Sequence, residues 1–131
     1  MRFHMTLSPL CLALALGVAA PDAVAQQPRP DSASIANAVR TLKSDLRNYV
    51  TAQETFYSVH STYAGTADAT TLKPSAGVTV IVLTFSPQGH NAVAIHKDAP
   101  GLVCGIWVGQ QHAPPLNDRA GEGEPTCRLP H

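Results

Sequence analysis

The cysteines are the first residues of this chain whose type and spacing could do chemistry. Cys104 and Cys127 are what remains of three cysteines if Cys11, inside an apolar N-terminal stretch, is removed with that stretch. An even cysteine count in an exported chain indicates a disulfide, which here would close a loop of roughly two dozen residues. The alternative is a reactive or metal-binding thiol pair, but the CxxC spacing typical of such pairs is missing.

The histidines show no metal-binding pattern. A metal site needs two to four converging ligands with supporting contacts. None of the histidine pairs beyond the N-terminal stretch has HxH, HxxxH or HExxH spacing. We therefore expect no metal and no cofactor. These residues are His60, His90, His96, His112 and His131.

Groups suited to nucleophilic or acid–base catalysis are equally scattered. The sequence contains no GxSxG elbow for a serine nucleophile. Asp45 and Glu54 fall half a turn out of phase on a predicted helix, so they do not form a carboxylate pair. Gly121 and Gly123 lie in a predicted loop, not in a strand-to-helix turn that could cradle phosphate. We expect no catalytic residues and no enzymatic activity.

Residues 1–25 have the pattern of a secretory signal peptide. Arg2 supplies the positive start, an apolar stretch follows, and the Ala-Val-Ala tripeptide at 23–25 predicts cleavage between Ala25 and Gln26. The apolar run is too short to span a bilayer, although its retention as a membrane anchor is the alternative. Cleavage predicts an exported protein, periplasmic or extracellular, without a stable membrane anchor.

The chain as a whole is small and has no net charge. The whole sequence has 131 residues, with nine Lys and Arg against nine Asp and Glu. This balance argues against a nucleic-acid partner, which would favour a basic patch. Residues 26–30 are predicted to be a flexible leader, and residues 31–131 to form a single domain.

The elements that would position these residues begin with a helix. Apolar residues recur in steps of three and four from Ile35 to Phe56, which predicts an amphipathic helix of about 25 residues with N-cap candidates from Asp31 onwards. Residues 58–76 are predicted to be a connecting loop. The polar face of the helix carries mixed charges and is expected to be solvated: Arg40, Lys43, Asp45, Arg47 and Glu54.

Three strands are predicted at residues 78–85, 91–97 and 102–108. Short turns between them indicate an antiparallel meander. The first strand is apolar on both faces, which favours a central position in the sheet. In the third, Trp107 faces away from Cys104 and Ile106. The predicted fold class is α+β, with one long N-terminal amphipathic helix packed on a three- to four-stranded antiparallel sheet.

Several of these segments together resemble the globular head of type IV pilins and type II secretion pseudopilins. The resemblance covers about residues 36–127. The helix stretch is the more specific part, and the strand matches are individually weaker. The matching segments are residues 43–54 with Phe56-Tyr57 and Thr62-Tyr63, the run Gly77-Val78-Thr79-Val80, the pattern Gly89-x-x-Ala92-x-Ala94-x-His96, Cys104, and the ending at residues 123–127.

The N-terminus departs from that family. A prepilin has a short basic leader, a Glu soon after the cleavage site and a long apolar helix, whereas this chain has Pro9 near the expected Glu and a short apolar stretch that ends at Pro21. The resemblance therefore implies a non-catalytic pilin-like head on a cleavable export signal, with protein partners in a pilus or secretion system of the cell envelope. The alternatives are a periplasmic small-ligand-binding module and a divergent, membrane-anchored pilin subunit.

Two residues stand out as a candidate contact surface. Trp107 is the single tryptophan and could either cover the outer side of the sheet or anchor a partner. His96 lies on the second predicted strand, and with Trp107 it is the candidate lining of a ligand site. The resemblance also implies contacts by the disulfide-bounded segment 110–125, with plain structural closure as the alternative.

Overall fold

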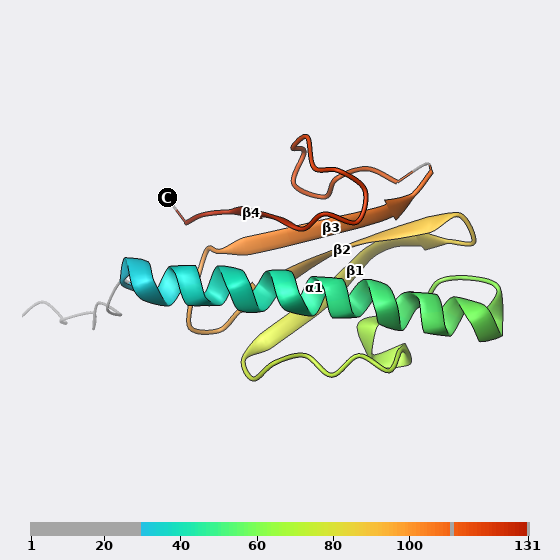
Figure 1. Cartoon of the computed structure of the whole chain (residues 1–131), viewed down its shortest axis with the longest axis horizontal. Helices are drawn as coiled ribbons and strands as arrows, with labels where there is room; N and C mark the ends of the chain where they lie inside the picture. Colours follow the sequence, from blue (N-terminus) through green and yellow to red (C-terminus); the bar gives the residue numbers. More distant parts are fainter. Residues whose placement is uncertain (1–29, 111, 131) are drawn as a thin grey trace, which may run out of the picture.

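The computed structural model describes residues 30–110 and 112–130. The elements run in the order α1, η1, β1, β2, β3 and β4. The long helix α1 crosses one face of a four-stranded sheet, and the chain after β3 folds back along the far edge (Figure 1). The predicted α+β class is confirmed, with four strands at the upper end of the expected number.

The helix α1 spans Ser32–His60 and is longer than the periodicity predicted. The side chain of its N-cap, Asp31, accepts a hydrogen bond from the Ser34 amide at 2.7 Å. At the other end, Ser61 adopts a left-handed conformation, and its amide donates to the Tyr57 carbonyl at 2.8 Å. Both ends are therefore capped by the chain's own groups.

The sheet is a meander with neighbours in sequence order. The strands are β1 (Val78–Ser86), β2 (Gly89–His96), β3 (Val103–Gly109) and β4 (Thr126–Arg128). All three pairings are antiparallel, and a β-bulge shifts the register of β1 between Val82 and Thr84. The predicted hairpins are confirmed, each with boundaries displaced by one or two residues.

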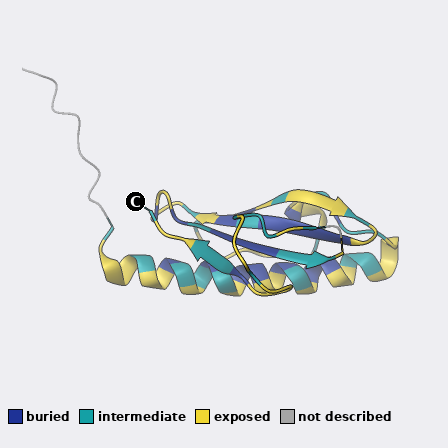
Figure 2. Ribbon diagram, turned by 90° about the horizontal axis from the view of Figure 1, so that it is seen from above, coloured by how far each residue is buried: buried dark blue, intermediate teal, exposed yellow. Residues whose placement is uncertain are grey.

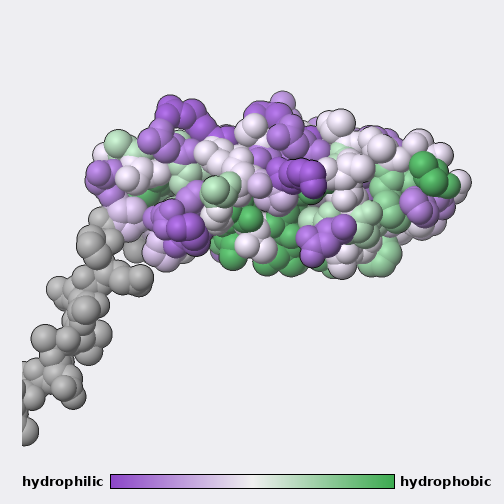
Figure 3. Space-filling view, turned by 90° about the horizontal axis from the view of Figure 1, so that it is seen from below, coloured by the Kyte–Doolittle hydropathy of each residue, from purple (hydrophilic) through white to green (hydrophobic). Residues whose placement is uncertain are grey.

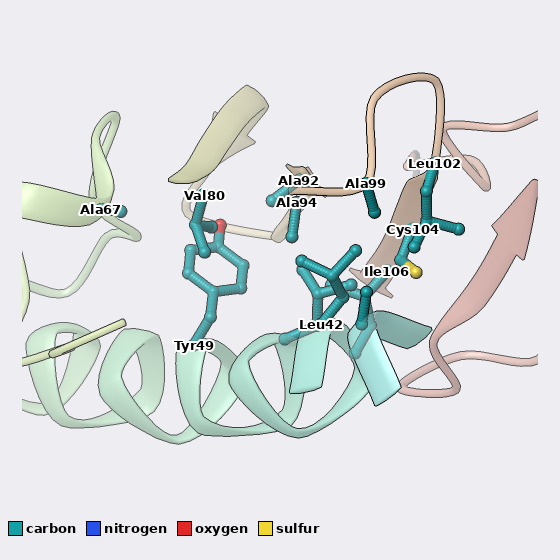
Figure 4. Packing of buried hydrophobic residues seen from close by; sticks show 12 residues of the cluster. Leu42, Tyr49, Ala67, Val80, Ala92, Ala94, Ala99, Leu102, Cys104 and Ile106 are labelled. Atoms are coloured by element: carbon teal, nitrogen blue, oxygen red, sulfur yellow. The ribbon is translucent and has the colours of Figure 1, made fainter. Parts of the chain in front are cut away.

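The core lies between α1 and the inner face of the sheet, where the buried residues gather (Figure 2). Small side chains on β2, Ala92 and Ala94, let the helix approach closely, and larger side chains of the helix fill the space (Figure 4). Leu42, Leu46 and Tyr49 are fully buried. Burial of each large side chain contributes about 1.5–3 kcal/mol, so this layer dominates the stability of the fold.

One residue predicted to be solvated belongs to the interior. Asp45 is only 2 % exposed. Its carboxylate accepts hydrogen bonds from the backbone amide of Ser75 at 2.8 Å and from the Ser75 hydroxyl at 3.0 Å. The prediction of a solvated Asp45 is wrong, because this side chain fixes the connection before β1 to the helix.

The buried side chain of Gln53 fixes the start of the same connection. Its amide nitrogen donates to the Ala64 carbonyl and its amide oxygen accepts from the Ala64 amide, at 2.9 and 2.7 Å. The nitrogen also donates to the hydroxyl of Tyr49 at 2.9 Å. The polar backbone of the connection therefore finds its partners inside the protein. The short helix η1 (Ala67–Ala69) follows.

The position of β1 also differs from the prediction. The strand order places it at the edge of the sheet, paired with β2 on one side only. Three large apolar side chains of this strand are substantially exposed, at 43 % for Ile81, 50 % for Leu83 and 53 % for Phe85. The apolar residues on both faces of β1 therefore do not indicate a central strand.

Truncation of the helix face should destabilise the protein strongly. We expect Leu46→Ala to lower the free energy of unfolding by about 2–5 kcal/mol, because a fully buried side chain is replaced by a cavity. The adjacent exposed residue provides a matched control, and Arg47→Ala should change stability by less than about 0.5 kcal/mol. Urea unfolding followed by circular dichroism measures both, and equal effects would contradict the proposed packing.

Candidate functional site

The two predicted cysteines form the disulfide that defines the site. Cys104 of β3 and Cys127 of β4 lie directly opposite each other in the strand pairing and are covalently joined. Cys104 is fully buried in the core, whereas Cys127 is half-buried at its margin. The disulfide therefore closes the intervening chain into a loop that starts on β3 and ends on the neighbouring strand β4. Residues 110 and 112–125, the described part of this segment, are called the tail loop below.

Trp107 holds the tail loop against the outer face of the sheet. Its side chain alternates with Cys104 and Ile106 and so points away from α1, as the sequence predicted. The indole N–H donates to the carbonyl of Ala120 at 3.0 Å, and the backbone carbonyl of Trp107 accepts from the Gly123 amide at 2.8 Å. The half-buried ring is thus part of the loop's support.

A glycine in β3 makes this close approach feasible. A Cβ atom on Gly105 would lie 2.5 Å from the Cγ atom of Pro115 and 3.2 Å from that of Leu116. Only a residue without a side chain allows the loop to lie this close to the strand. The apolar side chains of the loop therefore cover the outer face of β3.

Carboxylates of the tail loop complete its attachment. Asp118 accepts from the Ala120 amide at 3.1 Å and forms a second, short hydrogen bond with the hydroxyl of Thr126. Glu122 accepts from the Gly109 amide at 2.6 Å. The tail loop is consequently a built surface with fixed contacts.

A polar cluster that the sequence did not predict anchors the beginning of the loop. The Asn91 side chain accepts from the amide and hydroxyl of Thr84, at 3.0 and 2.8 Å, and donates to the Ala113 carbonyl at 3.0 Å. His112 contacts the hydroxyls of Thr84 and Ser86 at 2.9 and 3.1 Å. The only signal in the sequence is Asn91, a turn-forming residue inside a predicted strand.

The pair of Ser86 and His112 has the separation of a nucleophile and its base. The second ring nitrogen of His112, however, faces the hydroxyl of Thr84, where hydrolases place a carboxylate to orient and stabilise the imidazolium. The Ser86 oxygen also accepts from the Gln88 amide at 3.1 Å. The arrangement ties the β1–β2 hairpin to the tail loop and lacks the third group of a triad.

His90 lies buried beneath this cluster on the inner face. Its ring packs edge-on against Tyr49, with centroids 5.1 Å apart, and tilted against Tyr63 at 4.6 Å. Neither ring nitrogen has a hydrogen-bond partner among the described residues. Burial lowers the pKa of His90 to about 4, and the charge of nearby His112 contributes to the decrease. The ring is therefore neutral at physiological pH.

The pKa values of the tyrosines around His90 are raised, so burial favours the neutral form there as well. Burial raises the pKa of Tyr49 well above its ordinary value of 10. Burial also raises the pKa of Tyr63 to about 12, assisted by its hydrogen bond to Glu54 at 3.0 Å. Both phenols stay protonated, so this aromatic cluster is uncharged.

The structure does not bring His96 and Trp107 together. His96 lies on the inner face of β2, in line with Ala92 and Ala94, whereas Trp107 lies on the outer face of β3. His96 lines a surface groove of about 350 Å³ with Pro30 and other residues at the start of α1. The two side chains therefore lie on opposite faces of the sheet and do not share one surface.

The predicted cleavage site, between Ala25 and Gln26, lies outside the described residues. Within residues 30–110 and 112–130, no helix combines the length and apolar character needed to cross a membrane. The same part of the chain holds no group of three or more His, Cys, Asp or Glu residues placed to bind a metal ion.

Comparisons with models of known protein families, with curated protein sequences and with solved structures each find no match. The described architecture of an N-terminal helix on a four-stranded antiparallel sheet with a disulfide is nevertheless consistent with a pilin-like fold. The disulfide itself suggests an oxidising, extracytoplasmic location.

Loss of the disulfide should release the tail loop. We expect the double variant Cys104→Ser, Cys127→Ser to lower the free energy of unfolding by about 3 kcal/mol, the effect expected for a loop of this size. Trp107, the single tryptophan, should become more solvated because its indole bond to Ala120 is lost. A red shift of native-state tryptophan fluorescence measures this release, and an unchanged spectrum would contradict it.

The free energy of unfolding should decrease as the pH is lowered through a range set by His90. Its folded pKa of about 4 lies below the ordinary value of 6.5. Above pH 6.5 both states are neutral at this residue. As the pH falls from about 6.5 to about 4, the unfolded chain gains a proton that the folded protein does not, so up to about 3 kcal/mol of stability is lost.

The variant His90→Phe isolates this effect. It keeps an aromatic ring between the tyrosines and removes two unpartnered nitrogens, so the protein should stay folded while the pH dependence between 6.5 and 4 becomes shallower. The exposed Val59→Ala variant, which removes no titratable group, should keep the slope of the unchanged protein. Urea unfolding across this pH range compares them, and parallel curves for all three proteins would contradict the assignment.

Proposed function

We propose that this protein is a non-catalytic, pilin-like protein of the cell envelope that acts through surface contacts, as an accessory of a type IV pilus or secretion system. The observation that carries the proposal is the disulfide-closed tail loop fixed on the outer face of a sheet whose inner face holds one long helix. This combination supports the resemblance to pilin heads better than any single segment does.

The location is inferred from two independent features. The disulfide indicates an oxidising compartment, and residues 1–25 have the pattern of an export signal. Protein partners in that compartment, in a pilus or secretion machine, are the ones we propose. The protein should be periplasmic or released, and free of the membrane after cleavage.

The tail loop is the contact surface that fits this role. Its polar side chains Asn117, Arg119 and Glu124 are exposed, while its backbone is held by Trp107 and Asp118. A fixed loop binds a partner at a smaller cost in conformational entropy than a flexible one. Surface recognition therefore needs no rearrangement of the fold.

The alternative of a small-ligand-binding module has less support. It relied on one sheet face near His96 and Trp107, and these residues occupy opposite faces. A divergent, membrane-anchored pilin remains the other alternative. It differs from our proposal in the fate of the N-terminal segment, which a direct measurement can follow.

The proposal predicts a soluble exported protein that contacts an envelope protein through the tail loop. We expect N-terminal sequencing of the fractionated protein to give Gln26 as the first residue in the soluble envelope fraction. A photoreactive amino acid at Arg119 should yield a discrete cross-linked species in intact cells. The same group at Arg40, on the exposed face of α1, provides the control and should yield less.

Three outcomes would count against the proposal. Recovery of the segment after Met5 in membranes or sheared filaments would instead indicate an anchored pilin. A reduced protein in the cytoplasm would refute the envelope location. Equal cross-linking from Arg119 and Arg40 would refute the tail loop as the contact surface.

A further inference from the structure

The edge of the sheet at β1 has the composition of a buried strand. Residues 78–86 contain no charged side chain, and most are β-branched or aromatic. Edge strands of soluble proteins are usually protected by charges, prolines or bulges, because their unpaired backbone groups can bind another strand. Figure 3 views the side of the molecule where β1 forms the edge and shows hydrophobic surface gathered along the lower part of that view.

The register determines which backbone groups of β1 are unpaired. The Lys97 amide donates to the Gly77 carbonyl at 2.9 Å, so the pairs that exchange hydrogen bonds with β2 are Thr79 with Ile95 and then Ile81 with Val93. The N–H and C=O groups of the intervening residues must point away from β2. These residues are Val78, Val80 and Val82.

The backbone amide of Val78 confirms that these groups point away from β2. The amide of Val78 points outwards and donates to the Ser75 carbonyl at 3.0 Å, within the turn that precedes the strand. No backbone partner on that side is found for Val80 or Val82 within the described part of the chain. Two consecutive outward-facing residues therefore present both donors and acceptors to an additional strand.

A groove lies directly along these groups. Its volume is about 380 Å³, one wall is residues 78–82 of β1, and the other is formed by residues 65–68 and Pro74. Asp68 is the charged residue of this lining, and its side chain has no ion pair or hydrogen bond among the described residues. The groove thus combines an unpaired strand edge, apolar side chains and one negative charge.

We propose that this groove binds an extended segment of a partner protein, which adds to the sheet beside β1 and carries a Lys or Arg that faces Asp68. Main-chain hydrogen bonds to Val80 and Val82 would supply affinity, as in other cases of strand addition. Alternate apolar side chains of the segment would lie beside the exposed Ile81 and over Val80. The inference deepens the proposed function, since it rests on action through contacts and names one surface for them.

A second copy of this chain fits the groove less well. Antiparallel pairing of two β1 edges in one continuous sheet keeps both helices on the same side. The η1 wall and Asp68 of both copies would then meet at one seam, with like charges adjacent. Charge complementarity therefore favours a separate basic segment.

The test uses the exported, disulfide-bonded protein, labelled with ¹⁵N, and a synthetic peptide. The peptide is acetyl-Thr-Val-Lys-Val-Thr-Val-Thr-amide, with a second peptide in which Glu replaces Lys. We expect the first peptide to shift the amide signals of residues 65–68 and 78–82 in a saturable manner, and the second to bind about fivefold more weakly or less. Shifts confined to other residues, or none at millimolar peptide, would overturn the proposal.

Variants of the protein separate charge from backbone pairing. Asp68→Lys should weaken binding of the Lys peptide about fivefold or more, whereas Glu124→Lys, the same charge change on the tail loop, should leave it within about twofold. Val82→Pro removes an outward-facing amide at an edge, where proline is tolerated, and should weaken binding about tenfold. Equal affinity of Asp68→Lys and the unchanged protein would overturn the charge assignment without depending on whether the proline variant folds.

The remaining outcomes distinguish a partner segment from a second copy of this chain in the groove. Shifts of the same β1 amides that grow with protein concentration, in the absence of peptide, would overturn the proposal in favour of a second copy. Failure of peptide binding leaves the envelope location and the tail-loop contact standing. A reduced cytoplasmic protein that still binds the peptide would refute the proposed function and retain the strand-addition site.

Discussion

The packing of α1 on the alanine-lined face of β2 determines how the other elements are arranged. Ala92 and Ala94 are fully buried, and their methyl groups allow Leu42 and Leu46 to reach the sheet between the strands. Larger residues at these positions of β2 would push the helix away and open the core. One helix can cover only one face, however, so every outward side chain of the meander must find cover elsewhere or remain exposed to water.

The tail loop provides that cover for part of the outer face. Gly105 lets the loop lie close to β3, Trp107 binds it through its indole, and the disulfide at Cys104 prevents it from leaving. These contacts are few, which explains why the tail loop needs a covalent link at the margin of the core. A loop without regular secondary structure buries little apolar area, and the disulfide reduces the entropy lost when it is ordered.

The sequence was sufficient to predict the elements that depend on periodicity. The helix, the hairpins and the outward direction of Trp107 all follow from alternation and steps of three and four, which act locally. The sequence was insufficient to predict the burial of Asp45 and the edge position of β1. The partner of Asp45 is Ser75, which is remote in sequence. The edge position of β1 depends on whether another strand pairs on its free side, and the last strand, β4, pairs with β3 instead. The polar cluster around Asn91 could not be predicted for the same reason, because His112 belongs to the tail loop and is remote in sequence.

The exposed edge of β1 is protected in a way that restricts what can pair with it. The bulge between Val82 and Thr84 interrupts the ladder in the second half of the strand, and η1 stands in front of the first half. A whole sheet edge from another protein would meet η1, whereas a single extended chain fits between η1 and β1. An apolar edge can therefore remain open without the indiscriminate association that unprotected edges cause. The geometry therefore favours a single short strand over the edge of a whole sheet, and Asp68 favours a strand that carries a positive charge.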